Sequence, residues 1–291
     1  MKLLVLGAGG QLGAELVAQS PSRGIDAIAV TRADLDVEDS AAFQRRLDAT
    51  RPAQVVNTTA FHVVPDCDRF PERALAVNAA AVKHMAEACH TRGIGFVTYS
   101  TDYVFDGTKG SPYLETDLPR PLQTYGVSKF AGEILASLFH PDSVIIRTCG
   151  VYGGVSGSRS KQGNFVLTML KLSETKPELE VSAEQIVNPT YARDLAGATL
   201  DLLRGDPESG MYHLAAEGHC SWAEFAAATM DLAGRATRIV PVDHGGRSGT
   251  LRRPLFSALG NSRARERGVV LPHWRDGLQR YLSALALPSR S

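Results

Sequence analysis

The sequence lacks an excess of charge, paired cysteines and long apolar runs. Its 31 lysines and arginines balance 31 aspartates and glutamates, so no overall field draws the chain to nucleic acid or a membrane surface. Four cysteines in 291 residues show no CxxC pair and no metal-ligand spacing, which predicts reduced thiols and a cytoplasmic location. No apolar run reaches the roughly 20 residues that a membrane-spanning helix needs. These absences favour a small-molecule partner.

Short apolar runs alternate with longer amphipathic stretches through the first half of the chain. The runs LLVL, AIAV, QVVN, IGFVTYS and DSVIIRT are typical of strands buried on both faces. Helices are expected between them, near 11–20, 39–49 and 71–92. This alternation predicts an α/β fold, a Rossmann-type doubly wound parallel sheet with helices on both faces.

After about residue 150 the alternation loosens, and helices are expected at 191–204 and 221–233 among short strands. We predict an NAD(P)-binding Rossmann domain over 1–150. Residues 151–291 are expected to form a smaller α/β portion that mainly binds substrate, with some segments returning to the Rossmann domain. Ligands of open α/β sheets bind beyond the carboxyl ends of the strands, so the smaller portion is expected over that edge.

A glycine-rich turn separates the first predicted strand from the first predicted helix. The stretch LLVLGAGGQLGAEL contains Gly7, Gly10 and Gly13. In a dinucleotide-binding turn, such glycines allow a tight turn, a close approach to the pyrophosphate and close packing of helix on strand. The position between strand and helix favours this interpretation over a plain flexible turn.

The end of the second predicted strand, AVTRADLDV, bears on the choice between NADPH and NADH. Arg32 lies where NAD-binding sites usually have an acidic residue, and an arginine suits the 2′-phosphate of NADPH. Asp34 and Asp36 are close enough to bind the ribose or adenine instead, and Arg32 is also compatible with a solvated strand end. The sequence favours NADPH and leaves NADH open.

Tyr125 and Lys129 lie four residues apart in QTYGVSKFAGE, whose helix-forming residues place both side chains on one helix face. A neighbouring ammonium lowers the pKa of a phenol from about 10 toward neutral pH. Such a tyrosine donates a proton to an alkoxide that forms on a carbonyl carbon. The hydroxyls of Ser100 and Thr101, at the end of a predicted strand, are candidates to orient that carbonyl, and Thr101 is the better candidate.

In combination these motifs resemble the extended short-chain dehydrogenase/reductase family, with its N-terminal glycine loop, strand-end hydroxyl and YxxxK sequence 24 residues later. Five stretches, in order over nearly the whole chain, are similar to its dTDP-4-dehydrorhamnose reductase branch: STDYVFDG, YGVSKFAGE, GNFV, NPTYARDLA and RRPLFSALG. The resemblance implies NADPH-dependent reduction of the C4 ketone of a nucleotide-activated 4-keto-6-deoxy sugar.

The resemblance also implies roles for individual residues. Tyr125 would be the acid, Lys129 would lower its pKa and bind the nicotinamide ribose, and Thr101 would hydrogen-bond the ketone. The predicted cofactor-binding residues are Gly7, Gly10, Gln11, Leu12, Gly13, Arg32, Asp36, Val37, Thr59, Ala60, Phe61, Asn78, Ser100, Tyr125 and Lys129. The predicted substrate-binding residues are His62, Thr101, Asp102, Val104, Phe105, Gly150, Asn164 and Arg253.

The sequence departs from the branch on the sugar side. Where the branch typically has NAAAYTAVD, this chain has NTTAFHVVP, which introduces Phe61, His62 and Pro65. Gly150 replaces a tryptophan that commonly covers the sugar ring, which predicts a larger pocket. His62 is compatible with a ligand contact or with a plain lining role. The eight histidines show neither HxH nor HExxH spacing, so the sequence predicts no metal site.

Two further residues have two interpretations each. Arg253 suits a nucleotide phosphate or caps a loop, and Asn164 holds the nucleotide or begins a helix as its N-cap. The function also has alternatives. The same family includes a non-catalytic, NADP-binding regulatory subunit of methionine adenosyltransferase, and nucleotide-sugar epimerases use the same Tyr and Lys while retaining NAD. A homodimer is compatible with each of them.

Overall fold

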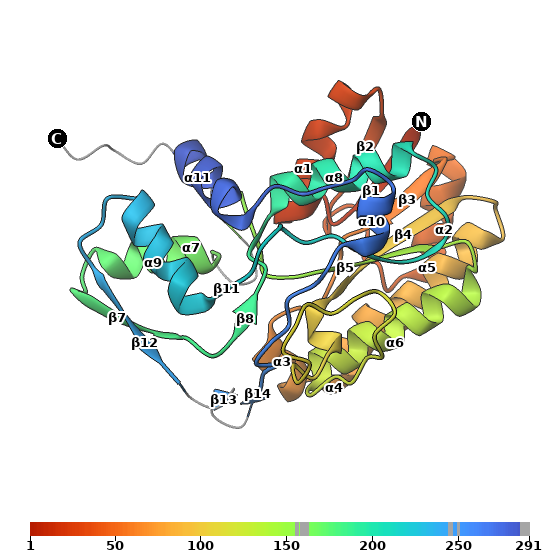
Figure 1. Cartoon of the computed structure of the whole chain (residues 1–291). Coiled ribbons are helices and arrows are strands. Elements are labelled where there is room, and N and C mark those ends of the chain that lie inside the picture. Colours follow the sequence, from red (N-terminus) through yellow and green to blue (C-terminus); the bar gives the residue numbers. More distant parts are fainter. Residues whose placement is uncertain (155–156, 158–162, 244–246, 249–250, 286–291) are drawn as a thin grey trace.

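A wholly parallel sheet of six strands forms the centre of the molecule (Figure 1). The structure is a computed structural model that describes residues 1–154, 157, 163–243, 247–248 and 251–285. From edge to edge the strands are β10 (Gly210–His213), β5 (Val144–Thr148), β4 (Gly95–Thr101), β3 (Gln54–Asn57), β1 (Lys2–Leu6) and β2 (Asp26–Val30). The five predicted strands are confirmed, and the strand order reverses between β1 and β3, where such sheets bind ligands.

Helices cover both faces of this sheet. On one face lie α1 (Gln11–Gln19), α8 (Ala192–Arg204) and α10 (Ser262–Glu266); on the other lie α2 (Ser40–Thr50), α5 (Ala81–His90) and α6 (Thr124–Phe139). Alternate residues of β1 serve the two faces, because Leu3 and Val5 pack in one core and Leu4 and Leu6 in the other. The doubly wound α/β fold is therefore confirmed.

The helix predicted over 71–92 is built from three segments. It consists of α4 (Pro71–Leu75), a π-helical turn (Ala76–Ala80) and α5, and α3 (Val64–Arg69) precedes it. The π-helical turn contains Asn78, whose side chain is fully buried. A widened turn of this kind often occurs at functional sites.

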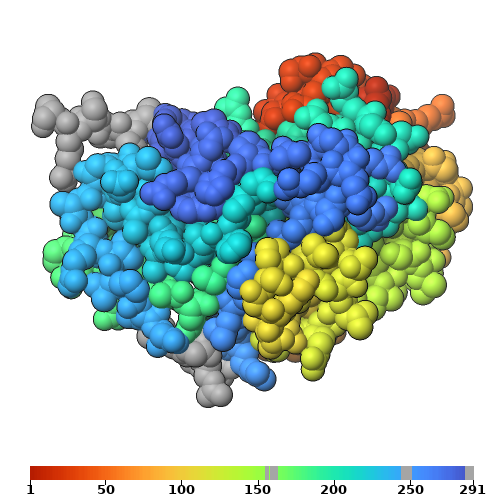
Figure 2. Space-filling view, in the orientation of Figure 1, coloured from red at the N-terminus to blue at the C-terminus, as the bar shows by residue number. Residues whose placement is uncertain are grey.

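The second half of the chain builds a further core around Tyr152, Phe225, Trp274 and Tyr281. Its elements are β6 (Val151–Tyr152), α7 (Phe165–Ser173), β7 (Glu178–Ser182), β8 (Ile186–Val187), β9 (Thr190–Tyr191), β11 (Cys220–Ser221), α9 (Trp222–Leu232), β12 (Arg238–Val242), β13 (Arg247–Ser248), β14 (Leu251–Arg252) and α11 (Trp274–Ala284). The helices predicted at 191–204 and 221–233 are α8 and α9. In the space-filling view both halves form one continuous body, with the cyan segment around α9 at one end (Figure 2).

Three elements that follow residue 150 lie with the first sheet: α8, β10 and α10 pack in or against its core. The functional division of the chain into cofactor- and substrate-binding portions remains a prediction. Within the described ranges, no helix combines the length and the apolar character needed to span a bilayer.

Candidate active site

Two cavities lie at the carboxyl ends of the parallel strands. The first, of about 230 Å³, is lined by residues that follow β1, β2 and β3. The second, of about 730 Å³, lies between the sheet and the second half of the chain, and its lining runs from Gln11 to Arg253. This edge of the sheet is where the sequence predicted the ligand.

The glycine turn has the geometry that a dinucleotide pyrophosphate requires. Gly7 has a φ of +80°, and a Cβ on Gly13 would lie 2.3 Å from the Gly7 carbonyl oxygen, so loop and helix approach more closely than any side chain allows. Helix α1 follows Gly10, has no side-chain cap and has no acidic residue in its first turn. Its first amide N–H groups and the positive end of its dipole are thus available to an anion.

The other two residues of this turn have different surroundings. Leu12 packs against the core beneath the sheet. Gln11 lines the second cavity, and its Oε1 accepts hydrogen bonds from the Gly153 N–H at 2.9 Å and Asn164 Nδ2 at 3.3 Å. The Gln11 side chain therefore joins the glycine turn to the second half of the molecule.

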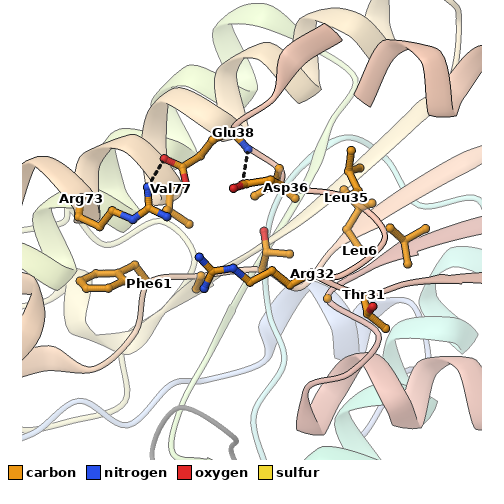
Figure 3. A pocket seen from close by; sticks show the side chains of 14 residues that line it. Leu6, Thr31, Arg32, Leu35, Asp36, Glu38, Phe61, Arg73 and Val77 are labelled. Atoms are coloured by element: carbon orange, nitrogen blue, oxygen red, sulfur yellow. Dashed lines mark hydrogen bonds and ion pairs between the residues drawn. The ribbon is translucent and has the colours of Figure 1, made fainter. Parts of the chain in front are cut away.

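The first cavity is lined by seven of the residues predicted to bind the cofactor (Figure 3). Those present in its lining are Gly7, Arg32, Asp36, Val37, Thr59, Ala60 and Phe61. The Arg32 side chain extends across the cavity toward Phe61, and no ion pair between described residues includes it. Asp34 turns away, because its carboxylate accepts hydrogen bonds from the N–H and Oγ1 of Thr31 at 2.8 and 2.7 Å. Of the two aspartates, only Asp36 faces the cavity.

Asn78 supports the wall of this cavity from behind. Its Oδ1 accepts from the Phe61 N–H at 2.9 Å, and its Nδ2 donates to the Phe61 carbonyl at 2.8 Å and to Ser128 Oγ at 3.0 Å. With its hydrogen bonds directed to the protein and its side chain buried, Asn78 lines neither cavity. The prediction that it lines the cofactor groove is corrected to a bracing role.

Thr101 and Tyr125 come together in the wall of the second cavity. Thr101 ends β4, and α6 begins at Thr124 with Gln123 as N-cap, whose Oε1 accepts from the Gly126 N–H at 2.7 Å. Gly126 lets the helix start lie against the preceding loop, because a Cβ there would lie 2.1 Å from the Tyr103 carbonyl oxygen. These contacts place Tyr125 beside the strand end.

Burial determines the protonation of Tyr125. It raises the pKa of this phenol, and the hydrogen bond from the Thr101 hydroxyl opposes that rise. The prediction of a lowered phenol pKa is therefore wrong for this structure. Tyr103, which also lines the cavity, packs edge-to-face on Tyr125 with ring centroids 6.0 Å apart. Sequence reasoning missed Tyr103, although it lies between two recognised motif residues.

Lys129 lies one turn after Tyr125, is 5% exposed and, like Asn78, lines neither cavity, so its contact with the nicotinamide ribose remains a prediction. Burial lowers its pKa to about 8, and the Glu133 carboxylate partly opposes this effect. Glu133 in turn receives two hydrogen bonds from Arg147 of β5, at 2.9 and 2.7 Å, and both side chains are 4% exposed. The buried Glu133–Arg147 pair was not predicted. The KxxxE spacing in the sequence indicates only that Lys129 and Glu133 lie one helical turn apart.

The residues predicted to bind substrate divide into two groups. His62, Thr101, Asp102, Gly150, Asn164 and Arg253 all line the second cavity, as does Ser100, which was predicted to bind cofactor. Val104 and Phe105 do not: both are fully buried, and Phe105 stacks on Tyr113 with ring centroids 4.0 Å apart. Their assignment was wrong because a 3₁₀ turn over Asp102–Val104 directs the following side chains into the core.

Three lining residues have distinct polar surroundings. The Asp102 carboxylate accepts from Ser257 Oγ at 2.6 Å and Thr101 Oγ1 at 3.0 Å, and burial raises its pKa. Asn164 caps α7, with its Oδ1 accepting from the Leu167 N–H at 3.0 Å, so the N-cap interpretation is confirmed. The buried Nε of Arg253 has no hydrogen-bond partner within the described ranges.

Gly150 has a φ of +56°, and a Cβ there would lie 3.1 Å from the Asn188 carbonyl oxygen, so this backbone disfavours any side chain. Aromatic rings reach the cavity from elsewhere instead. Phe165 and Trp222, whose ring centroids are 4.6 Å apart, both line it. Residues of β7 and the loop that follows it complete this wall: Glu180, Val181, Ser182 and Gln185. Their sequence carries no distinctive motif, and we did not predict them.

Comparison with known proteins identifies relatives over the whole chain. The family described as RmlD substrate binding domain matches residues 1–287. The spore coat polysaccharide biosynthesis protein SpsK of Bacillus subtilis is 41% identical over 97% of this chain and 96% of its own length. A dTDP-4-dehydrorhamnose reductase of Burkholderia thailandensis is 37% identical, over 94% of this chain and 96% of its own. The structure of a Bacillus anthracis dTDP-4-dehydrorhamnose reductase in complex with NADP matches with a TM-score of 0.89 at 30% identity, covering 97% and 99% of the two chains.

Proposed function

Because this chain belongs to the RmlD substrate binding domain family, we propose that it reduces the C4 ketone of a nucleotide-activated 4-keto-6-deoxy sugar with NADPH. The observation that carries this proposal is the meeting of Thr101 and Tyr125 in the wall of the larger cavity, with Lys129 one turn further along α6. A hydroxyl pair at a cavity wall is suited to proton donation to a carbonyl oxygen.

The residues of the first cavity and the glycine turn fit NADPH. The N-terminus of α1 would hold the pyrophosphate, and Arg32 would face the 2′-phosphate. Asp36 and Val37, with Ala60 opposite, would enclose the adenosine. Because Asp36 can accept a hydrogen bond from a ribose hydroxyl, NADH is also compatible with this site. When bound, the nicotinamide supplies a hydride to the ketone carbon.

Side chains of the protein would orient the ketone and donate the proton. The Thr101 hydroxyl, which donates to Asp102 in this structure, would turn to the ketone oxygen and orient it, and Tyr125, kept protonated at neutral pH by its burial, would deliver the proton to that oxygen. The ammonium of Lys129 stabilises the phenolate that remains and binds the nicotinamide ribose. Glu133 favours the charged form of Lys129 in spite of its burial.

The nucleotide sugar would occupy the second cavity. Arg253, whose buried Nε has no hydrogen-bond partner among the described residues, suits the diphosphate, and Asn164 lines the same cavity. His62 and Gly150 would face the sugar, where Gly150 leaves more room than a tryptophan. Trp222 and Phe165 offer apolar surface to a sugar or base from the opposite half of the molecule.

The direct test is NADPH oxidation, followed by nicotinamide absorbance, with freshly generated dTDP-4-keto-6-deoxy sugars of both C5 configurations. We expect saturable turnover and a product reduced at C4. NADPH binding without turnover of either sugar would favour the non-catalytic binding subunit instead. NAD that stays bound through purification, with no net oxidation, would favour an epimerase.

The exposed apolar side of α6 suits self-association, and the cysteines suit a reducing environment. Val127, Ile134 and Leu138 expose 46%, 52% and 68% of their surface along one side of α6, which suits a homodimer interface. Light scattering of the wild-type protein is expected to give twice the chain mass, and Leu138→Glu should return the mass of one chain. All four cysteines are buried and none forms a disulfide within the described residues, which is compatible with the reducing cytoplasm.

A further inference from the structure

His90, His140 and Asp142 gather on the molecule away from both cavities, and one potential ligand atom from each lies within 4.8 Å of the others. His90 is the last residue of α5, and His140 caps the end of α6. The two imidazole rings meet edge-to-face with centroids 5.2 Å apart. None of the three residues belongs to the proposed catalytic machinery.

The ring of His140 is already oriented as a ligand would be. Its Nε2 lies 2.9 Å from the Ile94 carbonyl oxygen, which can only accept, so Nε2 carries the hydrogen. Nδ1 therefore presents a lone pair. This atom is buried, in a residue 4% exposed, and has no hydrogen-bond partner within the described part of the chain. Metal-binding histidines commonly donate their other N–H group to a backbone carbonyl in this way.

The electrostatic surroundings favour a cation at this point. Helices α5 and α6 lie side by side on one face of the sheet (Figure 1), and His90 and His140 stand at their C-terminal ends. The negative ends of two helix dipoles therefore converge at the cluster. The exposed carboxylate of Asp142 adds a full negative charge.

We propose that His90, His140 and Asp142 bind a divalent transition-metal ion such as zinc. Two imidazole nitrogens and a carboxylate oxygen are a suitable ligand set, with water completing the coordination. Ligand atoms around zinc lie about 3–3.5 Å apart, so the exposed His90 and Asp142 side chains would close toward the fixed ring of His140. Fifty positions separate the two histidines, so local spacing in the sequence does not reveal the site.

The site would join the ends of two helices without entering the reaction. Tyr125 lies 15 residues before His140, which corresponds to about 22 Å along α6. Metal binding is therefore expected to raise thermal stability and to leave NADPH binding unchanged. Stability rises because the ion binds the folded arrangement and not the separated ligands of the unfolded chain.

The test is calorimetric titration of the chelator-treated, full-length protein with zinc chloride, with Co²⁺ absorption as a second measure of coordination. We expect one ion per chain, and a loss of affinity of roughly 10- to 100-fold in both His90→Ala and Asp142→Asn. Both changed residues are exposed, so these variants should fold. His219→Ala, which removes another exposed histidine, is the control and should bind as the wild type does.

Melting curves give a readout independent of calorimetry. One equivalent of zinc should raise Tm in the wild type and in His219→Ala, but not in His90→Ala. Undiminished zinc binding in His90→Ala and Asp142→Asn would place the ion elsewhere, for example at His62, and overturn the proposal. The absence of saturable binding in the wild type would overturn it as well.

Discussion

At the scale of single residues, the proposed contact of Lys129 with the nicotinamide ribose predicts that cofactor binding depends on pH. Burial lowers its pKa to about 8, so the ammonium loses its proton as pH rises through that value. We expect the affinity for NADPH to fall above pH about 8, because the charged form is the one that binds the ribose. Fluorescence titration of NADPH between pH 6.5 and 9.5 measures this dependence.

The lowered pKa of Lys129 also makes the stability of the fold depend on pH. Because the pKa of Lys129 is lower in the folded than in the unfolded protein, the unfolded chain binds more protons between pH 8 and 10.5. The contribution of Lys129 to stability therefore increases with pH across this window and is lost as pH falls through about 8.

Lys129→Arg is the control for the pH dependence of NADPH affinity. Because the arginine side chain stays charged, the NADPH affinity of this variant should not change between pH 6.5 and 9.5. A wild-type profile equally flat would show that Lys129 does not bind the cofactor as a cation.

Arg32 is expected to distinguish NADPH from NADH. A charge-assisted hydrogen bond contributes about 1.5–3 kcal/mol, so Arg32→Gln should raise the Kd for NADPH by roughly 10- to 100-fold. The Kd for NADH should change little, because NADH has no 2′-phosphate. Arg45→Gln, an exposed arginine on α2, is the control for loss of positive charge. Equal losses for both cofactors would assign Arg32 a structural role.

The sequence motifs correctly predicted several residues that lie at the carboxyl edge of the sheet. Thr101, Tyr125, His62 and Gly150 all line the second cavity, as expected from the resemblance. Val104 and Phe105 were not predictable, because position in a motif does not show which way a side chain points after a 3₁₀ turn. The contacts of Asn78 depend on packing between segments far apart in sequence.

At the scale of elements, helix α6 holds Tyr125 and Lys129 in place through close contacts with its neighbours. A Cβ on Gly132 would lie 2.2 Å from the Asn78 carbonyl oxygen in the π-helical turn. Gly132→Ala should therefore push α6 away, and we expect a loss of about 3 kcal/mol in the free energy of unfolding. Thermal melting should show Tm lower by roughly 5 °C.

Gly205→Ala is the matched control for this substitution. Gly205 caps α8 with a negative φ, and the nearest atom to an added Cβ is 3.4 Å away, so Tm should change little. If Gly132→Ala melted at the wild-type temperature, α6 and the π-helical turn would not be packed as described. The five strands were predictable from their apolar runs, whereas the π-helical turn has no local sequence signal.

At the scale of the whole molecule, Gln11 joins the glycine turn to Gly153 and Asn164 of the second half of the chain, and Tyr281 holds this arrangement in place. Asn164 Nδ2 donates to the Tyr281 hydroxyl at 2.8 Å, and that hydroxyl donates to the Gly154 carbonyl at 2.8 Å. Tyr281→Phe should remove about 1 kcal/mol of stability. Because Asn164 lines the second cavity, where we propose that the nucleotide sugar binds, and not the first, KM for the nucleotide sugar should rise several-fold while KM for NADPH is unchanged.

Tyr212→Phe serves as control for the lost hydroxyl. The Tyr212 hydroxyl, on edge strand β10 of the six-stranded sheet, donates to the Glu208 carbonyl, and neither residue lines the second cavity, so its removal should leave the KM for the sugar unchanged. Equal effects of both substitutions on the sugar KM would contradict a specific role for Tyr281. The sequence could not predict this arrangement, because the cavity wall combines residues from both halves that only the fold brings together.

We propose that Tyr125 donates the proton in a carbonyl reduction, and Tyr125→Phe removes that proton. The variant keeps the ring and its packing but has no acidic hydroxyl. With NADPH and the better of the two dTDP-4-keto-6-deoxy sugars, kcat should fall by roughly 10²–10⁴-fold while the Kd for NADPH stays near the wild-type value. A Tyr125→Phe enzyme that turns over at the wild-type rate would contradict the account.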